Sequence, residues 1–169
     1  MGGHDARAIA NHILDMAKEH GREITVMQLL KLIYIANGWS WALLGKQLVR
    51  DPVEAWQYGP VYRSVYRDFN KFGAEPITEK SAMLDGALPY SSRLADDERE
   101  LLMGVTEHYG KLHAFRLSDM THEPGTPWSQ IRGKEGTNAE IPQKLIKSHF
   151  EKLRDEQRER RGSAHSAVA

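Results

Sequence analysis

The chain has 169 residues, enough for one domain with a tail rather than for two domains. Apolar residues make up 40% and charged residues 27%, and 23 basic residues balance 23 acidic ones, so the formal net charge is zero. This balance argues against a dedicated nucleic-acid-binding protein, whose affinity comes mostly from the phosphates it neutralises.

Cysteine is absent, which excludes disulfides, thiolate metal ligands and cysteine nucleophiles. Residues 1–20 carry acidic side chains and no long apolar run, so they do not resemble a signal peptide. We therefore expect a cytoplasmic protein.

The first two predicted helices span residues 5–20 and 26–44. Thr25 and Gln28 have the spacing of a capping box at the start of the second helix, and Gly45 is placed to end it. This second helix is apolar along two stripes and approaches the length of a membrane span. Because Lys31 and Asn37 lie well inside it, we expect a helix at the centre of a bundle rather than in lipid.

Residues 47–58 alternate between two faces and are predicted to be extended, with a short edge strand. Gly59 and Pro60 are predicted to start the third helix, since proline suits the first helical position. A loop region over 74–94, a fourth helix over 95–109 and a fifth over 112–121 follow.

A long loop is predicted to hold Trp128, and Pro142 is predicted to open the last helix. Residues 151–161 are almost all charged, and residues 162–169 are expected to be disordered. The chain is thus predicted to be mostly α, a compact helical bundle around a central apolar helix with a short extended element before the third helix. Its domains are expected to be residues 1–150 and a charged helix end with a disordered tail over 151–169.

Residues suited to catalysis or metal binding form no convincing pattern. The histidines include no i,i+4 pair, so we expect no metal site. Ser118 and His122 lie close in sequence but lack a nucleophile-elbow motif, so a structural role is favoured over a catalytic one. There is also no glycine-rich phosphate loop, and we expect a protein that is not an enzyme and has no cofactor.

The third helix carries the most unusual surface pattern. Arg63, Arg67 and Lys71 recur every four residues, and Tyr62 and Tyr66 recur beside them. Tyrosine and arginine are enriched where proteins bind one another, but the same pattern occurs on a half-buried core edge with an ordinary solvated face. Both interpretations stay open here, with RNA stacking on the tyrosines as a weaker third. The predicted partner-binding residues are Tyr58, Tyr62, Arg63, Tyr66, Arg67 and Lys71.

Three segments in order, "LLKLIYIANGWSWALLGKQL", "EAWQYGPVYRSVY" and "LSDMTHEPGTPW", resemble the Panacea-domain family of SocA-like antitoxins, also described as GepA-like phage-associated proteins. The resemblance runs from about residue 8 to about residue 150. Its motif positions are Leu30, Lys31, Leu32, Tyr34, Trp56, Tyr58, Gly59, Pro60, Val61, Ser118, Thr121, His122, Pro127 and Trp128.

The resemblance implies a mostly helical antitoxin that neutralises a protein toxin by direct contact, without catalytic residues or a cofactor. Two alternatives remain: a proteolytic adaptor that delivers the toxin to an AAA+ protease, and a small nucleic-acid-binding regulator. DNA is the less expected partner because no residues remain for an added DNA-binding domain. The motif residues need not each touch the toxin.

Overall fold

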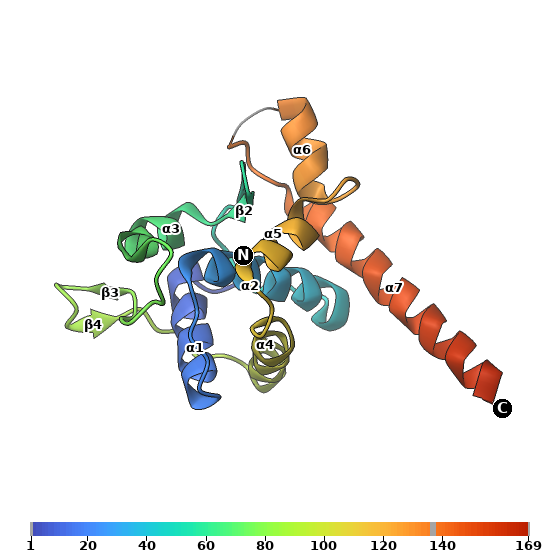
Figure 1. Ribbon diagram of the computed structural model, residues 1–169, viewed down its shortest axis with the longest axis horizontal. Helices are drawn as coiled ribbons and strands as arrows, with labels where there is room; N and C mark the ends of the chain where they lie inside the picture. The colour runs from blue at the N-terminus through green and yellow to red at the C-terminus, as the bar shows by residue number, and fades with distance from the viewer. Residues whose placement is uncertain (1, 136–137, 169) are drawn as a thin grey trace.

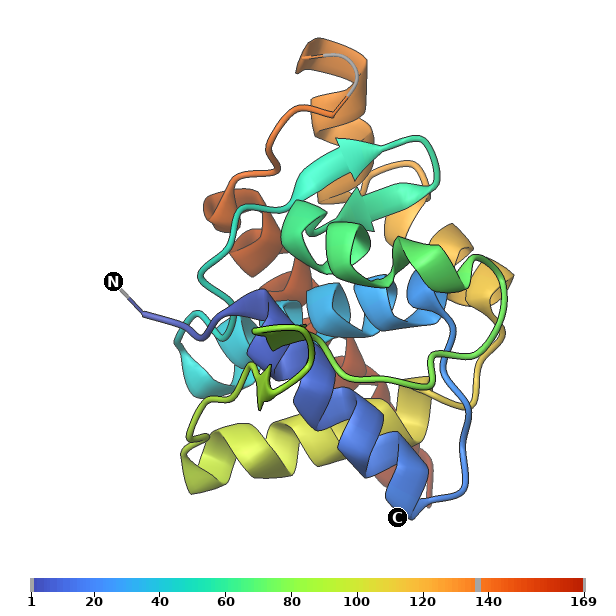
Figure 2. The same cartoon turned by 90° about the vertical axis from the view of Figure 1, so that its left-hand side faces the viewer.

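A computed structural model describes residues 2–135 and 138–168, which form a mostly helical domain (Figure 1). Helix α1 spans Ala6–Glu19, and the Asp5 side chain accepts a hydrogen bond from the Arg7 N–H at its start. Figure 2 shows α2 crossing the middle of the molecule, with a β-hairpin and α3 above it and α1 and α4 below.

Helix α2 spans Val26–Trp39 and is the centre of the core. The predicted capping box is present, with the Thr25 N–H donating to Gln28 Oε1 at 2.9 Å. The helix continues as a wider π-helical turn, η1, over Ser40–Leu44 and stops at Gly45, whose φ is 70°. The buried Asn37 has polar partners, because its Oδ1 accepts from the backbone N–H groups of Leu48 and Val49. The central position predicted for this helix is confirmed.

The segment predicted to start the third helix is instead the second strand of a hairpin. Strand β1 (Glu54–Trp56) pairs antiparallel with β2 (Gly59–Val61), and α3 begins only at Arg63 and runs to Phe69. The prediction failed because Gly59 adopts a φ of 118°, a left-handed turn conformation that a helix start does not use. Proline fits β2 because this strand lies at an edge of its two-stranded sheet.

A second hairpin follows the short 3₁₀ turn η2 (Asn70–Phe72). Its strands are β3 (Ala82–Met83) and β4 (Leu88–Pro89). Helix α4 then spans Asp96–Tyr109, close to the predicted range.

Two more helices precede the last one: α5 (Ala114–His122) and α6 (Pro127–Glu135). The predicted long loop around Trp128 is therefore wrong. The signals that start α6 lie within a few residues of each other. Thr126 Oγ1 accepts a hydrogen bond from the Ser129 N–H, and Pro127 occupies the first helical position.

Helix α7 spans Gln143–Val168 and extends away from the body of the domain (Figure 1). It continues past Gly162, where the sequence predicts a disordered tail; its many Arg, Glu and Ala residues favour helix without needing an apolar face. The predicted division at residue 150 falls inside α7 and stays a prediction. No helix in the described part of the chain is both long and apolar enough to cross a membrane.

Candidate functional site

Motif residues from three helices converge on the β1–β2 hairpin and hold its backbone. Four side chains donate hydrogen bonds of 2.5–3.2 Å to backbone carbonyls of this hairpin: Lys31 to Pro60, Ser118 to Tyr58, Trp128 to Trp56 and Arg132 to Ala55. The other edge of β1 is also paired, since the Ala55 N–H donates to the Ala139 carbonyl at 2.8 Å. The hairpin is thus fixed by α2, α5 and α6 together.

Lys31 lies under the hairpin turn, and only 1% of its surface is exposed. Its Nζ donates to the Pro60 carbonyl at 3.0 Å. Burial disfavours the charged ammonium and lowers the pKa of Lys31 to about 7. A Cβ atom at residue 59 would lie 2.7 Å from Lys31 Cε and 3.1 Å from Thr121 Oγ1, so only glycine leaves room for the lysine here.

Ser118 and His122 use their polar atoms to support backbone. The Ser118 hydroxyl has one proton, which it donates to the Tyr58 carbonyl at 2.5 Å. His122 Nδ1 hydrogen-bonds the Ser118 carbonyl, and its ring meets the Trp128 ring edge-on at 5.2 Å between centroids. Ser118 Oγ also lies 3.4 Å from His122 Nδ1, but both atoms make shorter hydrogen bonds to backbone carbonyls, so the arrangement supports the hairpin and positions Trp128.

The remaining family positions in α2 and β2 lie in the core. Leu30, Leu32, Tyr34 and Val61 are all buried. The Tyr34 ring packs edge-on against Phe150 of α7, and burial raises the pKa of its hydroxyl. These positions therefore support the fold from inside.

Tyr62, which we predicted to contact a partner, is completely buried. Because the hairpin runs to Val61, helix α3 starts later than predicted and Tyr62 is its capping residue instead of a position on its outer face. The other five predicted partner residues reach the surface: Tyr58, Arg63, Tyr66, Arg67 and Lys71.

The basic stripe of α3 is partly neutralised by carboxylates. Arg63 pairs with Glu54 at 2.8 Å, and this hydrogen-bonded pair lowers the pKa of Glu54. Lys71 pairs with Glu79 at 3.3 Å. Within the described residues Arg67 forms no ion pair, so it carries the stripe's free charge.

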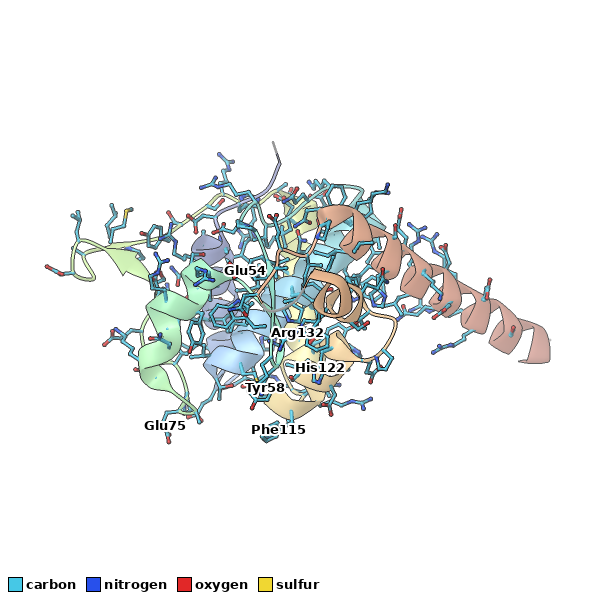
Figure 3. The ribbon with its side chains drawn as sticks, turned by 90° about the horizontal axis from the view of Figure 1, so that it is seen from above. Glu54, Tyr58, Glu75, Phe115, His122 and Arg132 are labelled. Carbon is cyan, nitrogen blue, oxygen red and sulfur yellow. The ribbon has the colours of Figure 1, made fainter. Side chains whose placement is uncertain are left out.

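Three aromatic side chains stand out on the hairpin side of the molecule. Tyr58 is 59% exposed at the hairpin turn, Tyr66 of α3 is 37% exposed, and Phe115 of α5 is 71% exposed. Tyr58 and Tyr66 border a cleft of about 420 Å³ between α2, α3 and the hairpin. Figure 3 shows Tyr58 and Phe115 on the same side of the molecule, and the Ser118–Tyr58 bond joins their elements.

We call Tyr58, Tyr66, Arg67 and Phe115 the hairpin face. Sequence patterns missed Phe115, because an aromatic residue in a short amphipathic helix is normally expected to face the core. The cleft was also missed, because its walls come from segments that are distant in sequence. No group of three or more His, Cys, Asp or Glu side chains is placed to bind a metal ion within residues 2–135 and 138–168.

Comparison with known proteins relates this site to a family. Residues 29–129 match the family described as antitoxin SocA-like, Panacea domain. Antitoxin SocA of Caulobacter vibrioides (strain NA1000 / CB15N) is 36% identical over 154 residues, which cover 86% of this chain and 82% of that protein. No solved structure matches the chain significantly. The family match includes Lys31, both hairpin strands and α5, and it ends just after Trp128.

Proposed function

Because this chain belongs to the SocA-like antitoxin family with a Panacea domain, we propose that it is an antitoxin that neutralises a protein toxin through its hairpin face. The observation that carries the proposal is the group of exposed aromatic side chains on the β1–β2 hairpin, α3 and α5, beside a hairpin backbone that is fixed by four side-chain hydrogen bonds.

The hairpin face has the chemistry of a protein-binding surface. Exposed tyrosine and phenylalanine side chains supply large apolar area at a small entropic cost, and they often dominate binding energy. Since the hairpin is already held in place, binding loses little backbone freedom. Arg67, without an ion pair among the described residues, would mainly quicken association with an acidic patch on the toxin.

We predict that Tyr58→Ala combined with Arg67→Glu weakens toxin binding by about 100-fold, as expected for losing an aromatic anchor and reversing a charge. Neither side chain is needed by the core: Tyr58 contributes its backbone carbonyl, and Arg67 is exposed. The measurement is titration calorimetry against the protein toxin, which we expect to be encoded beside this antitoxin, together with urea unfolding of each variant.

Arg99→Glu is the matched control, because Arg99 is exposed on α4 and lies outside the hairpin face. Its affinity for the toxin should equal that of the wild type. Wild-type affinity in the double variant, with unchanged stability, would place the toxin-binding surface elsewhere.

The proteolytic-adaptor alternative is favoured by one feature. Helix α7 extends away from the body of the domain and does not cover the hairpin face (Figure 1). A protease bound to α7 would therefore leave the hairpin face open to the toxin. Incubating toxin and antitoxin with an AAA+ protease distinguishes the two mechanisms, since only an adaptor makes toxin disappear. Nucleic-acid binding gains no support from α3, where Glu54 and Glu79 pair with two of the three basic side chains.

A further inference from the structure

A second groove, of about 760 Å³, lies between α4 and α7, on the opposite side of the molecule from α3 (Figure 1). Its apolar surface comes from Trp39 and Leu43 of α2 and η1, and from Leu101 and Val105 of α4. Leu43 is 53% exposed and Leu101 is half-buried, so these two supply the solvent-facing apolar surface, whereas Trp39 and Val105 are buried. None of these residues belongs to the hairpin face.

Gly104 lies in the middle of the α4 wall of the groove. Glycine weakens the interior of a helix relative to alanine. Packing against the rest of the described chain does not require glycine here, because a Cβ at this position would meet no atom within 4 Å outside the adjacent helix backbone. The missing side chain leaves room for another chain to approach the α4 backbone closely.

The α7 wall of the groove is basic. Arg158, Arg160 and Arg161 line it and form no ion pair within the described residues. The neighbouring Arg154 donates to the Ala42 carbonyl at 2.6 Å and ties α7 to η1. Among the side chains that the structure describes, no carboxylate lines the groove, although α7 also contains acidic residues such as Glu159.

We propose that this groove binds an amphipathic helix of a partner protein that has an apolar stripe flanked by carboxylates. The stripe would cover Leu43, Leu101 and Val105, the carboxylates would pair with the α7 arginines, and the helix would approach α4 over Gly104. Charge complementarity selects an acidic helix, because among the described residues the lining has arginines and no carboxylate. The inference goes beyond the proposed toxin contact and uses a different surface.

Two fluorescent helical peptides of about 15 residues test the proposal. They share one leucine stripe, and their flanking positions are all glutamate in one peptide and all lysine in the other. The full-length protein should bind the glutamate peptide about tenfold more tightly or better by fluorescence anisotropy, and added salt should reduce the difference. Equal binding of the two peptides, or binding of neither, would overturn the proposal.

Two variants test whether the peptide binds in this groove: Gly104→Leu, and the double change Arg158→Glu with Arg161→Glu. Leucine favours helix and a Cβ at this position has open space around it, so the first variant should fold while its side chain extends into the groove. Each variant should bind the glutamate peptide about tenfold more weakly, and the Arg99→Glu control should bind it as the wild type does. Undiminished binding by Gly104→Leu would also overturn the proposal. The toxin affinity of the same variants is measured as well, so that a failure of the groove proposal can be distinguished from a failure of the hairpin-face proposal.

Discussion

Lys31 places an amine in the apolar centre of the domain, where it donates a hydrogen bond to the Pro60 carbonyl. The arrangement depends on Gly59, because any side chain there would enter the space that Lys31 and Thr121 occupy. The family motif of α2, which contains Lys31, and that of the hairpin, which contains Gly59, therefore pack against each other. Lysine from α2 and glycine from the hairpin turn are each required by the other.

The lowered pKa of Lys31, about 7, makes its contribution to stability depend on pH. Between about pH 7 and 10 the unfolded chain binds a proton on this amine that the folded chain does not, so raising the pH favours folding. We predict that the free energy of unfolding of the wild type, relative to Lys31→Met, rises by up to about 1.4 kcal/mol per pH unit over this range.

Urea unfolding of both proteins at intervals from about pH 6 to 10 measures this difference, since contributions from other groups cancel. Below about pH 7 the amine is protonated in both states, so the difference should become constant. Parallel stability curves across the whole range would show that Lys31 keeps its ordinary pKa.

At the scale of elements, helix α7 is joined to the centre of the fold by close contact with α2. Phe150 is buried, and its ring lies 5.4 Å from the Trp39 ring and 5.9 Å from the Tyr34 ring, centroid to centroid. Its ring also covers Gly38, where a Cβ would lie 2.2 Å from the nearest Phe150 atom. The absent side chain of Gly38 is what allows the two helices to pack this closely.

We predict that Gly38→Ala destabilises the protein by about 2 kcal/mol or more, because the rigid Phe150 ring has to move out of its packed position. The matched control is Gly104→Ala, the same change inside α4 where a Cβ meets nothing. That variant should be more stable than the wild type by about 0.5–1 kcal/mol, since alanine favours helix. Thermal and urea unfolding of the two variants compare the positions directly; the same sign for both would show that helix propensity outweighs packing at Gly38.

At the scale of the whole molecule, a core centred on α2 carries projecting parts: the β3–β4 hairpin, α6 and the outer turns of α7 (Figures 1 and 2). The hairpin face and the α4–α7 groove lie on different sides of this core. Opposite charges are balanced over the chain, with 23 basic and 23 acidic residues and an isoelectric point near 7.1. We therefore expect association with partners to depend on local charge, such as that of Arg67, rather than on an overall field.

This balance predicts a solubility minimum near pH 7 for the isolated protein, because net charge keeps protein molecules apart. Solubility in a fixed concentration of precipitant should increase severalfold by about pH 5.5 and again by about pH 8.5. Precipitation curves measured across this range test the prediction. A steady trend through pH 7 would show that self-association is controlled by an apolar surface instead.

Local signals in the sequence were sufficient to predict most helices. Thr25 and Gln28 cap α2 as predicted, and Gly45 ends the helical turn that follows. Each of these signals acts on backbone groups within a few residues, so no knowledge of the remaining chain is needed. The mostly helical class, the central α2 and the family membership also followed from the sequence.

The hairpin and its surroundings were decided by tertiary structure. Whether Gly59 and Pro60 start a helix or pair as a strand depends on Lys31, Ser118 and Trp128, which are distant in sequence and hold the hairpin carbonyls. The same contacts bury Tyr62 and turn Tyr58 outward. Local propensity cannot decide which residues face the core when the deciding neighbours come from other elements. The side chains of the proposed partner-binding face could therefore be chosen only from the three-dimensional structure.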